Sequence, residues 1–383
     1  MAELRAIFAG GGTGGHLFPA IAIADEFRAL RPGSEILFVG TRKKLESRVV
    51  PERGYALRTI WISGFRRGFR PGNLLFPLKV LTSMLQARSI IRNFHPDVVV
   101  GTGGYVSGPV LAAAVRAGIP TLIQEQNSYP GVTTRILARR VDEVHLTFES
   151  SRKLIGRTEN VFVTGNPTRA SLGGVSREDG LRAFGFDPAS ANATVLIVGG
   201  SLGAHSINEA IARHVGTFES RGIRCIWQTG TEDAKAYAVL EKPGSVWTRP
   251  FIDRMDCAYA AADLVVCRAG ATTIAELTRL GKPAVLIPYP HAAANHQVEN
   301  ARTLVEAGAA ELIPDHEAAA RVGTVVTGLI DGGKLGAMSG RSRALGKPDA
   351  AREIARRMID LAGRSPRAAA PAPDSRPGPG NAA

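Results

Sequence analysis

The chain contains the same local pattern twice: a short apolar strand, then a glycine-rich loop, then the start of a helix. In the first copy the strand covers residues 4–9 and the loop covers residues 10–15. In the second copy the strand covers residues 193–198, the loop covers residues 199–203, and a helix begins near His205. A strand, a glycine loop and a helix in this order open a βαβ unit. Two copies this far apart predict two nucleotide-fold domains rather than one large sheet.

Other short stretches have the composition of buried parallel strands. They are rich in Val, Ile and Leu and are separated by helical patterns, as in sheets that are covered on both faces. They are residues 36–39, 97–100, 121–123, 144–146 and 161–163 in the first half, and 225–228, 246–248, 264–267 and 284–287 in the second. The predicted fold class is therefore α/β, with one parallel sheet in each half.

We place the first domain at residues 1–166 and the second at residues 167–345. Residues 346–364 are expected to form a C-terminal helix that packs back on the first domain. The segment GNPTR (165–169), in which Pro167 fixes the backbone, is the predicted hinge.

The composition limits the cellular setting. A chain of 383 residues is long for one core and sufficient for two. No apolar run approaches the about 18–20 residues that span a bilayer, and the N-terminus has no signal-peptide architecture. The three cysteines lack CxxC spacing and are expected to be reduced thiols of a cytoplasmic protein. Residues 365–383 are rich in Pro, Ala and Gly, so we expect a disordered tail.

The net charge of +13 suggests an anionic partner: nucleic acid, a phosphorylated substrate or a membrane surface. A coding bias towards Arg would explain the charge without a partner.

Residues 64–88 combine basic and apolar side chains, which is typical of a membrane-surface element. Each basic residue near anionic lipid contributes about 1 kcal/mol. An amphipathic core helix would explain only the apolar part. The predicted membrane patch consists of Arg66, Arg67, Arg70, Leu74, Leu75, Leu78, Lys79 and Leu81.

The first glycine loop, GGGTGGH, ends in His16. Glycines let the backbone approach a ligand, and the N-terminus of the following helix attracts an anion. The loop lacks the Gly-Lys-Ser/Thr of a Walker A sequence. The next strand ends at Thr41-Arg42 instead of at an acid for a ribose hydroxyl, which leaves an NADP site using Arg42 as an alternative. His16 is either a helix-start residue bonded to a backbone carbonyl or a general base held between two domains.

Two further segments follow predicted strands of the first half. GTGGYVSGP (101–109) is expected to be a glycine-rich turn, and QEQN (124–127) follows the next strand along the chain. Both lie where α/β sheets place their ligands. Glu125 could orient a substrate hydroxyl or the His16 ring, or it could be a solvated loop acid.

The second half has its own ligand-type segments. GGSLGA (199–204) offers backbone N–H groups and the Ser201 hydroxyl, a phosphate cradle without lysine. CRAGATTIAE (267–276) is a glycine turn before a helix, on which Glu276 could bond both hydroxyls of a ribose. The segment 289–301 is either a capped helix start or a cluster for sugar hydroxyls, formed by Asn295, His296, Gln297 and Asn300. No DxD sequence or metal-ligand spacing occurs, so helix dipoles and arginines, with Arg169 and Arg268 available, would neutralise a pyrophosphate.

Together these motifs resemble those of the MurG-type glycosyltransferases of bacterial peptidoglycan synthesis. The matching motifs run from Gly10 to Ala301 in the order GGGTGGHLFPA, GTGGYVSGP, EQN, GNPTR, GGSLGA, FID, CRAGATTIAE and HQVENA. The resemblance implies the GT-B fold, two Rossmann-like domains facing across a cleft. It implies inverting, metal-independent transfer of N-acetylglucosamine (GlcNAc) from UDP-GlcNAc to the MurNAc 4-hydroxyl of lipid I, undecaprenyl-pyrophosphoryl-MurNAc-pentapeptide. The product is lipid II, and no cofactor is expected.

The resemblance also implies roles for individual residues. His16 would be the catalytic base, with Glu125 as helper or rival. Ile252 would meet uracil through its backbone, Glu276 the ribose, and Gln297 the GlcNAc hydroxyls. The full UDP-GlcNAc set is Thr13, Gly14, Gly15, Asn127, Arg169, Ser201, Ile252, Ala271, Thr272, Thr273, Glu276, Gln297 and Asn300. The acceptor's pyrophosphate set is Gly14, Gly15, Gly103, Gly104, Tyr105 and Ser107.

The implied setting is the cytoplasmic face of the bacterial inner membrane, with peripheral attachment to its anionic surface, cell-wall synthesis proteins as partners and no nucleic acid.

Two positions depart from the family pattern. Gln124 stands where histidine is frequent, and Leu202 replaces a frequent glutamine. The alternatives are another GT-B enzyme (a diacylglycerol glycosyltransferase or a UDP-GlcNAc 2-epimerase), an NADP oxidoreductase, and a non-enzymatic basic protein that binds membranes or nucleic acid. The last is disfavoured because RNA-type aromatic platforms are absent.

Overall fold

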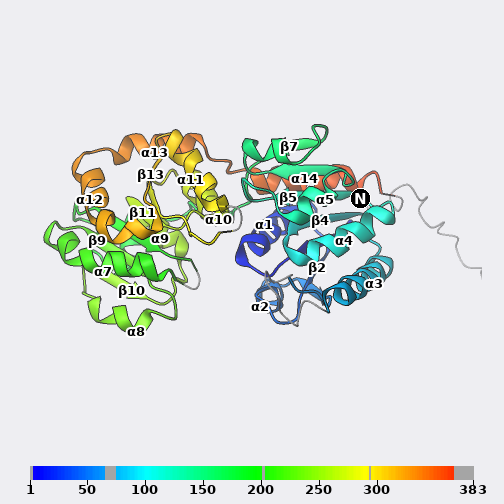
Figure 1. Cartoon of the computed structure of the whole chain (residues 1–383), viewed down its shortest axis with the longest axis horizontal. Coiled ribbons are helices and arrows are strands. Elements are labelled where there is room, and N and C mark those ends of the chain that lie inside the picture. Colours follow the sequence, from blue (N-terminus) through cyan, green and yellow to red (C-terminus); the bar gives the residue numbers. More distant parts are fainter. Residues whose placement is uncertain (1–2, 65–74, 201–202, 293–294, 366–383) are drawn as a thin grey trace, which may run out of the picture.

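The computed structural model describes residues 3–64, 75–200, 203–292 and 295–365. Of the predicted functional residues, Arg66, Arg67, Arg70, Leu74 and Ser201 lie outside these ranges, as does nearly all of the predicted tail. The described chain forms two halves that lie side by side, each built around one sheet (Figure 1). The two parallel sheets expected from the strand pattern are both present.

The first half contains a seven-stranded parallel sheet in the order β3-β2-β1-β4-β5-β6-β7. Its strands are β1 (Arg5–Gly10), β2 (Glu35–Gly40), β3 (Ala56–Thr59), β4 (Val98–Gly103), β5 (Thr121–Glu125), β6 (Glu143–Leu146) and β7 (Val161–Val163). Its helices are α1 (Gly14–Leu30), α2 (Glu46–Glu52), α3 (Phe76–Phe94), α4 (Gly104–Arg116) and α5 (Val132–Leu137), followed by a short 3₁₀ helix, Glu149–Leu154.

The second half contains a six-stranded parallel sheet in the order β10-β9-β8-β11-β12-β13. Its strands are β8 (Thr194–Val198), β9 (Arg224–Gln228), β10 (Val246–Arg249), β11 (Leu264–Cys267), β12 (Ala284–Leu286) and β13 (Ala310–Leu312). Its helices are α6 (Arg177–Ala183), α7 (His205–Ser220), α8 (Ala234–Tyr237), α9 (Met255–Ala261), α10 (Ala271–Leu280), α11 (His296–Glu306), α12 (Ala318–Asp331) and α13 (Leu335–Ala344).

Both sheets are covered on two faces, which explains why their central strands read as continuous apolar runs. In the first half, α1 packs on one face with buried residues such as Phe27, while α3 and α4 cover the other face with residues such as Ile91 and Leu111. The glycine loops follow β1 and β8, the central strands at which each sheet reverses its order. This is the position at which open α/β sheets bind ligands.

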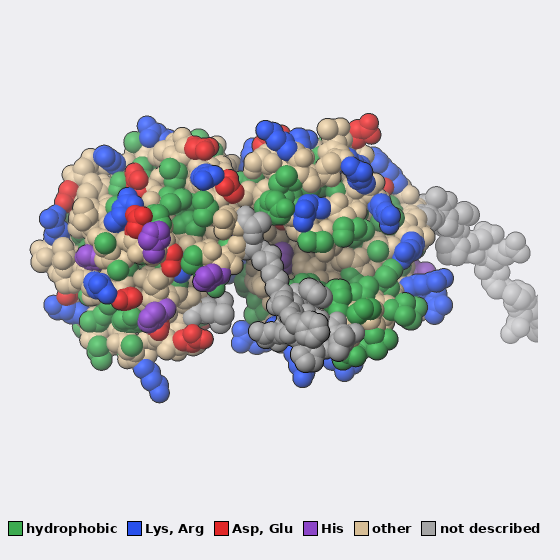
Figure 2. Space-filling model, viewed as in Figure 1, with side chains coloured by type: hydrophobic (Ala, Val, Ile, Leu, Met, Phe, Trp, Pro, Cys, Tyr) green, Lys and Arg blue, Asp and Glu red, His purple; other side chains and the backbone are tan. Residues whose placement is uncertain are grey.

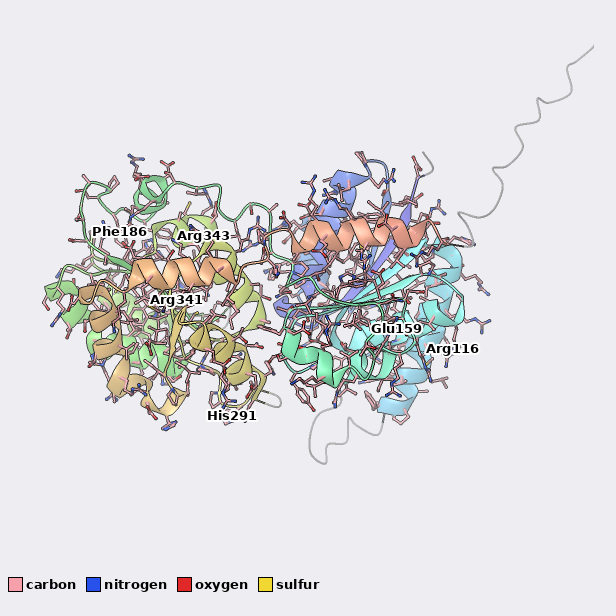
Figure 3. The ribbon with its side chains drawn as sticks, turned by 90° about the horizontal axis from the view of Figure 1, so that it is seen from above. Arg116, Glu159, Phe186, His291, Arg341 and Arg343 are labelled. Carbon is pink, nitrogen blue, oxygen red and sulfur yellow. The ribbon has the colours of Figure 1, made fainter. Side chains whose placement is uncertain are left out.

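The last helix, α14 (Ala350–Ala362), returns to the first half and packs on α1. Its apolar face, which includes Ile354, Met358 and Leu361, is buried in the same core as Phe27. Seen from above, α13 covers the second half and α14 covers the first, so the chain crosses between the halves a second time (Figure 3). The two segments that cross between the halves are in contact, because a Cβ at Gly165 would lie 2.5 Å from the Cβ of Lys347. The domain limits at 166 and 345 stay a prediction.

Three details of the fold differ from the expectation. The edge strands β3 and β13 were not predicted, because they are short and only partly buried and so lack a Val/Ile/Leu run. The strand expected at 97–100 continues to Gly103 as β4, so the first three residues of GTGGYVSGP are strand, not turn. Ser365 was assigned to the tail, yet it is buried and its hydroxyl donates to Asp97 Oδ1 at 3.2 Å.

Candidate functional site

His16 lies in the first turn of α1, directly after the glycine loop that follows β1. Its ring nitrogen Nδ1 is 3.0 Å from the carbonyl oxygen of Thr102 and 2.8 Å from Oε1 of Gln126. The Thr102 hydroxyl in turn donates to the carbonyl of His16 at 2.8 Å. The backbone-carbonyl contact expected for a structural histidine therefore exists, but it occupies only one of the two ring nitrogens.

The side chain that orients His16 is the amide of Gln126, not the carboxylate of Glu125 that the sequence suggested. Glu125 is buried, and its Oε2 accepts hydrogen bonds from the Gly131 amide at 2.9 Å and the Thr134 hydroxyl at 2.7 Å. Its Oε1 accepts a bond from the Asn127 amide at 3.1 Å. Glu125 thus holds the loop that precedes α5, and it is neither a solvated acid nor a partner of His16. No pattern around Gln126 would have identified it, because its role depends on the pairing of separate strands.

Glycines bring the two loops of the first half into contact around His16. A Cβ at Gly103 (φ +101°) would lie 2.6 Å from His16 Nδ1. A Cβ at Gly104 (φ +76°) would lie 2.5 Å from the carbonyl oxygen of Gly11. Both positions combine a left-handed backbone with a close approach, so only glycine is free of strain there. These two glycines position the histidine, whichever ligand the loop also binds.

A buried carboxylate lies beneath the first glycine loop. Glu46 at the start of α2 accepts hydrogen bonds from the Gly12 amide (3.0 Å), the Thr41 amide (2.9 Å) and the Thr41 hydroxyl (2.7 Å). Glu46 therefore ties the loop to the end of β2, the position at which a dinucleotide site would recognise its ribose. Glu46 was not predicted, because it lies six residues beyond the strand and no motif marks it among the other acidic residues of the chain.

Two of the predicted acceptor residues differ in what they offer a ligand. Ser107 is buried, and its hydroxyl donates to the carbonyls of Ala9 (2.6 Å) and Gly103 (2.7 Å) and accepts from the Gly103 amide (3.0 Å). Its expected contact with a pyrophosphate would require these bonds to break. Tyr105 is 56% exposed and its ring lies over Gly64, so it remains accessible.

In the second half, Gln228 at the end of β9 connects two predicted donor segments. Its Nε2 donates to the carbonyl of Gly200 at 2.8 Å, and its Oε1 accepts from the Ile252 amide at 2.9 Å. The backbone N–H of Ile252 is thus already used, which leaves its carbonyl for a base. Gln228 was not predicted, although it stands at the carboxyl end of a central strand, the signal that identified the other segments.

Glu276 on α10 is half-buried, with 13% of its side chain exposed. Tyr259 donates its hydroxyl to Glu276 at 2.9 Å, and a guanidinium nitrogen of Arg169 lies 3.9 Å from the carboxylate. Burial raises the pKa of Glu276, while Arg169 and Tyr259 act in the opposite direction. Arg169 also lies over the ring of Phe18 on α1, at 5.9 Å. It therefore bridges the two halves two residues away from His16.

The start of α10 carries a polar group that its surroundings do not satisfy. The buried Oγ1 of Thr272 has no hydrogen-bond partner among the residues that the structure describes. Buried hydroxyls are rarely left without a partner. Ala271 and Thr273 flank it in the first turn of the same helix, which contains no acidic residue. This helix N-terminus is therefore suited to an anionic group.

The predicted GlcNAc-binding amides already have partners. Asn300 is buried and links the halves, because its Oδ1 accepts from the Ser128 amide (3.2 Å) and its Nδ2 donates to the carbonyl of Ala269 (3.2 Å). Gln297 accepts from the Tyr289 amide at 2.9 Å. Both residues lie near the contact between the halves, but neither presents a free amide oxygen.

Arg268 is not available to a pyrophosphate, contrary to the sequence analysis. Its guanidinium pairs with Asp315 and donates to the carbonyl of Ile287 (3.0 Å) and to the hydroxyl of Ser206 (2.9 Å). The side chain is mostly buried, so it fastens the start of α7 to the ends of β11 and β12. Arg169 remains the guanidinium near the predicted donor residues.

The described part of the predicted membrane patch is an exposed apolar face. Leu75, Leu78 and Leu81 are 48%, 51% and 59% exposed, and Leu85 continues the same side of α3 at 61%. Lys79 lies beside them, 2.9 Å from the Ser63 hydroxyl and over the ring of Trp61. Hydrophobic side chains gather over this part of the first half (Figure 2). The alternative of a simple core helix does not explain this face.

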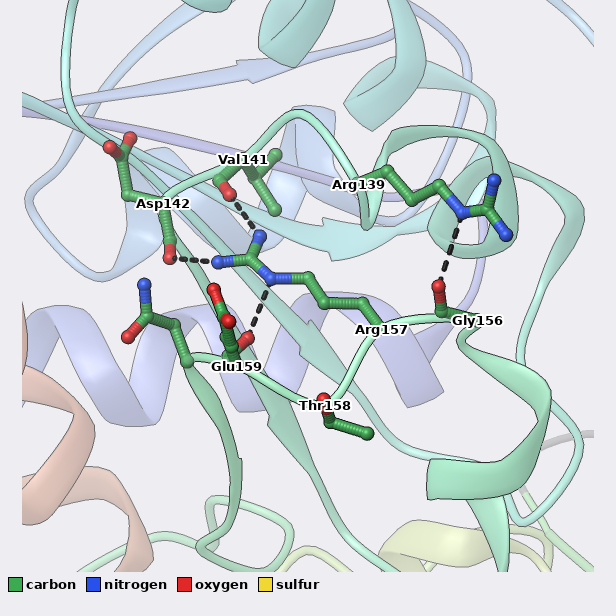
Figure 4. Close-up of a pocket in the computed structure, with 8 residues that line it drawn as sticks. Arg139, Val141, Asp142, Gly156, Arg157, Thr158 and Glu159 are labelled. Atoms are coloured by element: carbon green, nitrogen blue, oxygen red, sulfur yellow. Dashed lines mark hydrogen bonds between the residues drawn. The ribbon is translucent and has the colours of Figure 1, made fainter.

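A surface pocket of about 550 Å³ lies apart from all of these residues, between the 3₁₀ helix and β7. Arg157 donates across it to the backbone carbonyls of Val141 (2.5 Å), Asp142 (3.0 Å) and Glu159 (2.6 Å) (Figure 4). The guanidinium is used to hold the loops together. None of the predicted site residues lines this pocket.

Over the described ranges, no helix is both long and apolar enough to cross a membrane. Within the same ranges, no group of three or more His, Cys, Asp and Glu side chains is arranged to hold a metal ion.

Comparison with known families assigns both halves of the chain. The N-terminal domain of glycosyltransferase family 28 matches residues 6–146, and the C-terminal domain of the same family matches residues 194–354.

Curated relatives match almost end to end. The UDP-N-acetylglucosamine–N-acetylmuramyl-(pentapeptide) pyrophosphoryl-undecaprenol N-acetylglucosamine transferase of Chlorobaculum parvum is 49% identical over 365 residues, which cover 94% of this chain and 99% of the relative. The protein of the same name from Porphyromonas gingivalis is 46% identical and covers 92% of this chain and 94% of its own.

Solved structures show the same architecture. The crystal structure of Acinetobacter baumannii MurG superposes with a TM-score of 0.73 at 28% identity, covering 93% of this chain and 99% of that one. A putative UDP-N-acetylglucosamine 2-epimerase from Listeria monocytogenes has a TM-score of 0.65 at 14% identity, which indicates a shared fold alone. The expected fold class, two Rossmann-like domains of the GT-B type, is confirmed.

Proposed function

Because this chain belongs to glycosyltransferase family 28, and within it to the MurG-type N-acetylglucosamine transferases, we propose that it transfers GlcNAc from UDP-GlcNAc to lipid I and so forms lipid II. Membership in this family removes the oxidoreductase and the non-enzymatic protein as alternatives. The enzyme is a glycosyltransferase of peptidoglycan synthesis, the process that also underlies cell shape and division.

One observation carries the proposal for the site. Arg169 lies between Glu276, the predicted ribose ligand, and Phe18, two residues after the predicted base. The donor side and the acceptor side therefore meet at this arginine. An aligned attack between two bound substrates gains a large part of its rate from such positioning.

The proposed chemistry is a single in-line displacement. The MurNAc 4-hydroxyl oxygen attacks the anomeric carbon of GlcNAc, and the bond from that carbon to the β-phosphate oxygen of UDP breaks. The hydroxyl proton passes to Nε2 of His16, and UDP leaves with the bonding electron pair. Attack from the face opposite the leaving group inverts the anomeric configuration. A positioned base commonly contributes about 10²–10⁴-fold in rate.

The departing UDP carries growing negative charge. We assign its stabilisation to Arg169, to the second glycine loop with Ser201, and to the N-terminus of α10. The unpartnered Thr272 hydroxyl supports a phosphate contact there. The mechanism so derived uses these groups in place of a metal ion. Gln297 and Asn300 would have to exchange their present partners in order to reach the GlcNAc hydroxyls.

For the acceptor, we place the pyrophosphate of lipid I at the start of α1 and α4, near Gly14, Gly15, Gly104 and Tyr105. We place the exposed leucines of α3 against the anionic cytoplasmic face of the inner membrane, as a peripheral attachment. The enzyme has to bind a lipid-linked substrate at the bilayer surface, so an exposed apolar face on the acceptor-side half suits this reaction. Cell-wall synthesis proteins stay predicted partners.

The test uses purified protein, UDP-GlcNAc and a lipid I analogue, with UDP release measured in the presence and absence of EDTA. We expect release that depends on the acceptor and persists in EDTA, and a β-linked disaccharide by NMR of the product. Release without an acceptor would support an epimerase or hydrolase instead. Loss of activity in EDTA would overturn only the metal-free mechanism, and an α-linked product only the inversion.

A further inference from the structure

We infer that Gln126 is a positioning residue that fixes the tautomer of His16, so that its Nε2 is the proton acceptor. This inference rests on the proposed function in one respect, the role of His16 as base. The assignment of the tautomer itself depends only on hydrogen bonds in the structure.

The orientation of the Gln126 amide is determined by its neighbours. Its Nε2 lies within hydrogen-bond distance of three acceptors, the backbone carbonyls of Thr102 (2.7 Å) and Gln124 (3.2 Å) and Oε1 of Gln124 (2.5 Å), which share its two hydrogens. Backbone carbonyls can only accept, so this end of the amide must be the NH₂ group. Oε1 of Gln126 therefore faces His16. Gln126 is only 2% exposed, so these bonds are shielded from bulk water.

The protonation of His16 follows from its two neighbours. Nδ1 faces Oε1 of Gln126 at 2.8 Å and the carbonyl of Thr102 at 3.0 Å, and neither oxygen can donate. Nδ1 must therefore carry the proton. In the neutral ring the lone pair then lies on Nε2. Nε2 has no hydrogen bond to any residue in the described ranges, so it is free to take a proton from a substrate hydroxyl.

The use of an amide rather than a carboxylate has a chemical consequence. In triads of the Ser-His-Asp type, a carboxylate both holds the tautomer and stabilises the imidazolium that forms. A neutral amide holds the tautomer without adding negative charge beside the ring. Gln126 therefore orients the base but does not stabilise the imidazolium with a negative charge, as a carboxylate would.

The departure at Gln124 belongs to the same arrangement. Gln124 supplies an acceptor to the Gln126 amide at 2.5 Å, and its own Nε2 is directed toward Thr147 (3.4 Å). The residue that differs from the usual family histidine thus contributes to orienting the base, through one intervening side chain.

The experiment compares wild type with Gln126→Met and Gln126→Glu, using ¹⁵N-histidine NMR to read the tautomer and the pH profile of kcat to read the base. The eight histidines are resolved by subtracting the spectrum of His16→Gln. Wild type should show the Nδ1–H form. Gln126→Met should shift His16 toward a mixture of forms and lower kcat by about 10–100-fold, the range typical when the hydrogen-bond partner of a metal-bound histidine is removed. Gln126→Glu should keep the Nδ1–H form and move the acid limb of the profile to higher pH.

Gln86→Met is the matched control, because Gln86 also gives its Oε1 to one partner, the Trp61 amide at 2.7 Å, but lies on α3 away from His16. It should leave both the tautomer and the pH profile unchanged. If Gln126→Met keeps the Nδ1–H form and a kcat within twofold of wild type, the inference is overturned. The base assignment fails separately, if His16→Ala retains kcat within a few-fold, because the tautomer spectra are read without turnover.

Discussion

The two glycine loops occupy equivalent places after the central strand of their sheets, yet they are built differently. The amide of Gly12 in the first loop is bonded to the buried carboxylate of Glu46. In the second loop the backbone at Gly200 is held by the neutral amide of Gln228, through the carbonyl oxygen. The first loop thus gives an N–H group to an internal anion, whereas in the described part of the second loop the internal bonds of Gly200 and Gly203 involve only neutral groups.

This difference indicates a division of labour. A carboxylate beneath a loop repels a second anion that approaches the same amides, whereas a neutral amide does not. Both loops are followed by helices with no acid in the first turn, so the carboxylate of Glu46 makes the difference and favours the second loop as the site for the charged donor. In the proposed mechanism the first loop holds His16 against β4 and leaves the charged donor to the second loop, while the helix that follows it receives the acceptor's pyrophosphate.

Gly103→Ala tests the first loop most severely. The new Cβ would lie 2.6 Å from His16 Nδ1 at a backbone φ of +101°, so the ring must move. We expect kcat to fall by about 10²-fold or more, as for loss of a positioned base, while the Kd for UDP-GlcNAc stays unchanged. Steady-state kinetics and calorimetric titration measure the two quantities.

The matched control for Gly103→Ala is Gly118→Ala. Gly118 also has a positive φ, of +69°, but nothing lies within 4 Å of the added Cβ. If the control loses as much turnover as Gly103→Ala, backbone strain rather than displacement of the histidine explains the effect.

Gly203→Ala tests the second loop. Its Cβ would lie 2.2 Å from the carbonyl oxygen of Thr229, at a φ of +86°. Strain of this kind costs about 1–3 kcal/mol, which corresponds to tens-fold weaker UDP-GlcNAc binding with kcat at saturation nearly unchanged. Gly244→Ala, with a φ of +81° and open space around it, is the control. A fall in kcat with unchanged KM would contradict the division of labour.

The pH dependence of donor binding should depend on Glu276. Burial raises the pKa of this carboxyl, so it becomes protonated at a higher pH than an exposed glutamate. If the carboxylate accepts the ribose hydroxyls as proposed, affinity for UDP-GlcNAc should be full above the raised pKa and should fall several-fold as the pH drops through it. In Glu276→Gln the affinity should be lower and flat over the same range. Calorimetric titrations with UDP-GlcNAc at decreasing pH measure this. If the Kd depends on pH equally in wild type and Glu276→Gln, Glu276 does not bind the ribose.

Glu46→Gln should have the smallest effect on turnover. The amide keeps one acceptor but directs an NH₂ group at the N–H donors of Gly12 or Thr41. We expect the free energy of unfolding to fall by about 1–3 kcal/mol, the cost of an unsatisfied buried donor. Both kcat and the donor KM should stay within a few-fold. Tighter binding of UDP-GlcNAc in this variant would mean that the donor phosphates lie at the first loop after all.

The fold was predictable from the sequence because it depends on local signals. The central strands are buried on both faces and so consist of Val, Ile and Leu, and each glycine loop marks the strand before it. The edge strands β3 and β13 carry a weaker signal, because both are short and only partly buried and because Arg58 and Glu311 interrupt their apolar residues. The positions of Glu276 and Arg169 at one site followed from the family resemblance, since they lie on different elements of the chain.

The side chains that hold the site together were not predictable. Gln126, Gln228 and Glu46 act through partners that are distant in sequence, and their types occur at many positions without a role. Arg268 was named as available to a pyrophosphate because it stands in the glycine turn before α10, but Asp315 from another segment pairs with it. Pairings of this kind depend on the tertiary arrangement and leave no periodic pattern in the chain.

The return of α14 has a consequence for biosynthesis. This helix leaves the ribosome only after the second half of the chain, yet its Ile354, Met358 and Leu361 complete the core that begins with β1 and α1. The apolar surface of α1 around Phe27 must therefore stay uncovered while the whole second half is translated and folds. Domains of a growing chain usually fold in the order in which they emerge. Here the half that emerges first is finished last, and its exposed surface needs protection for the whole time of translation.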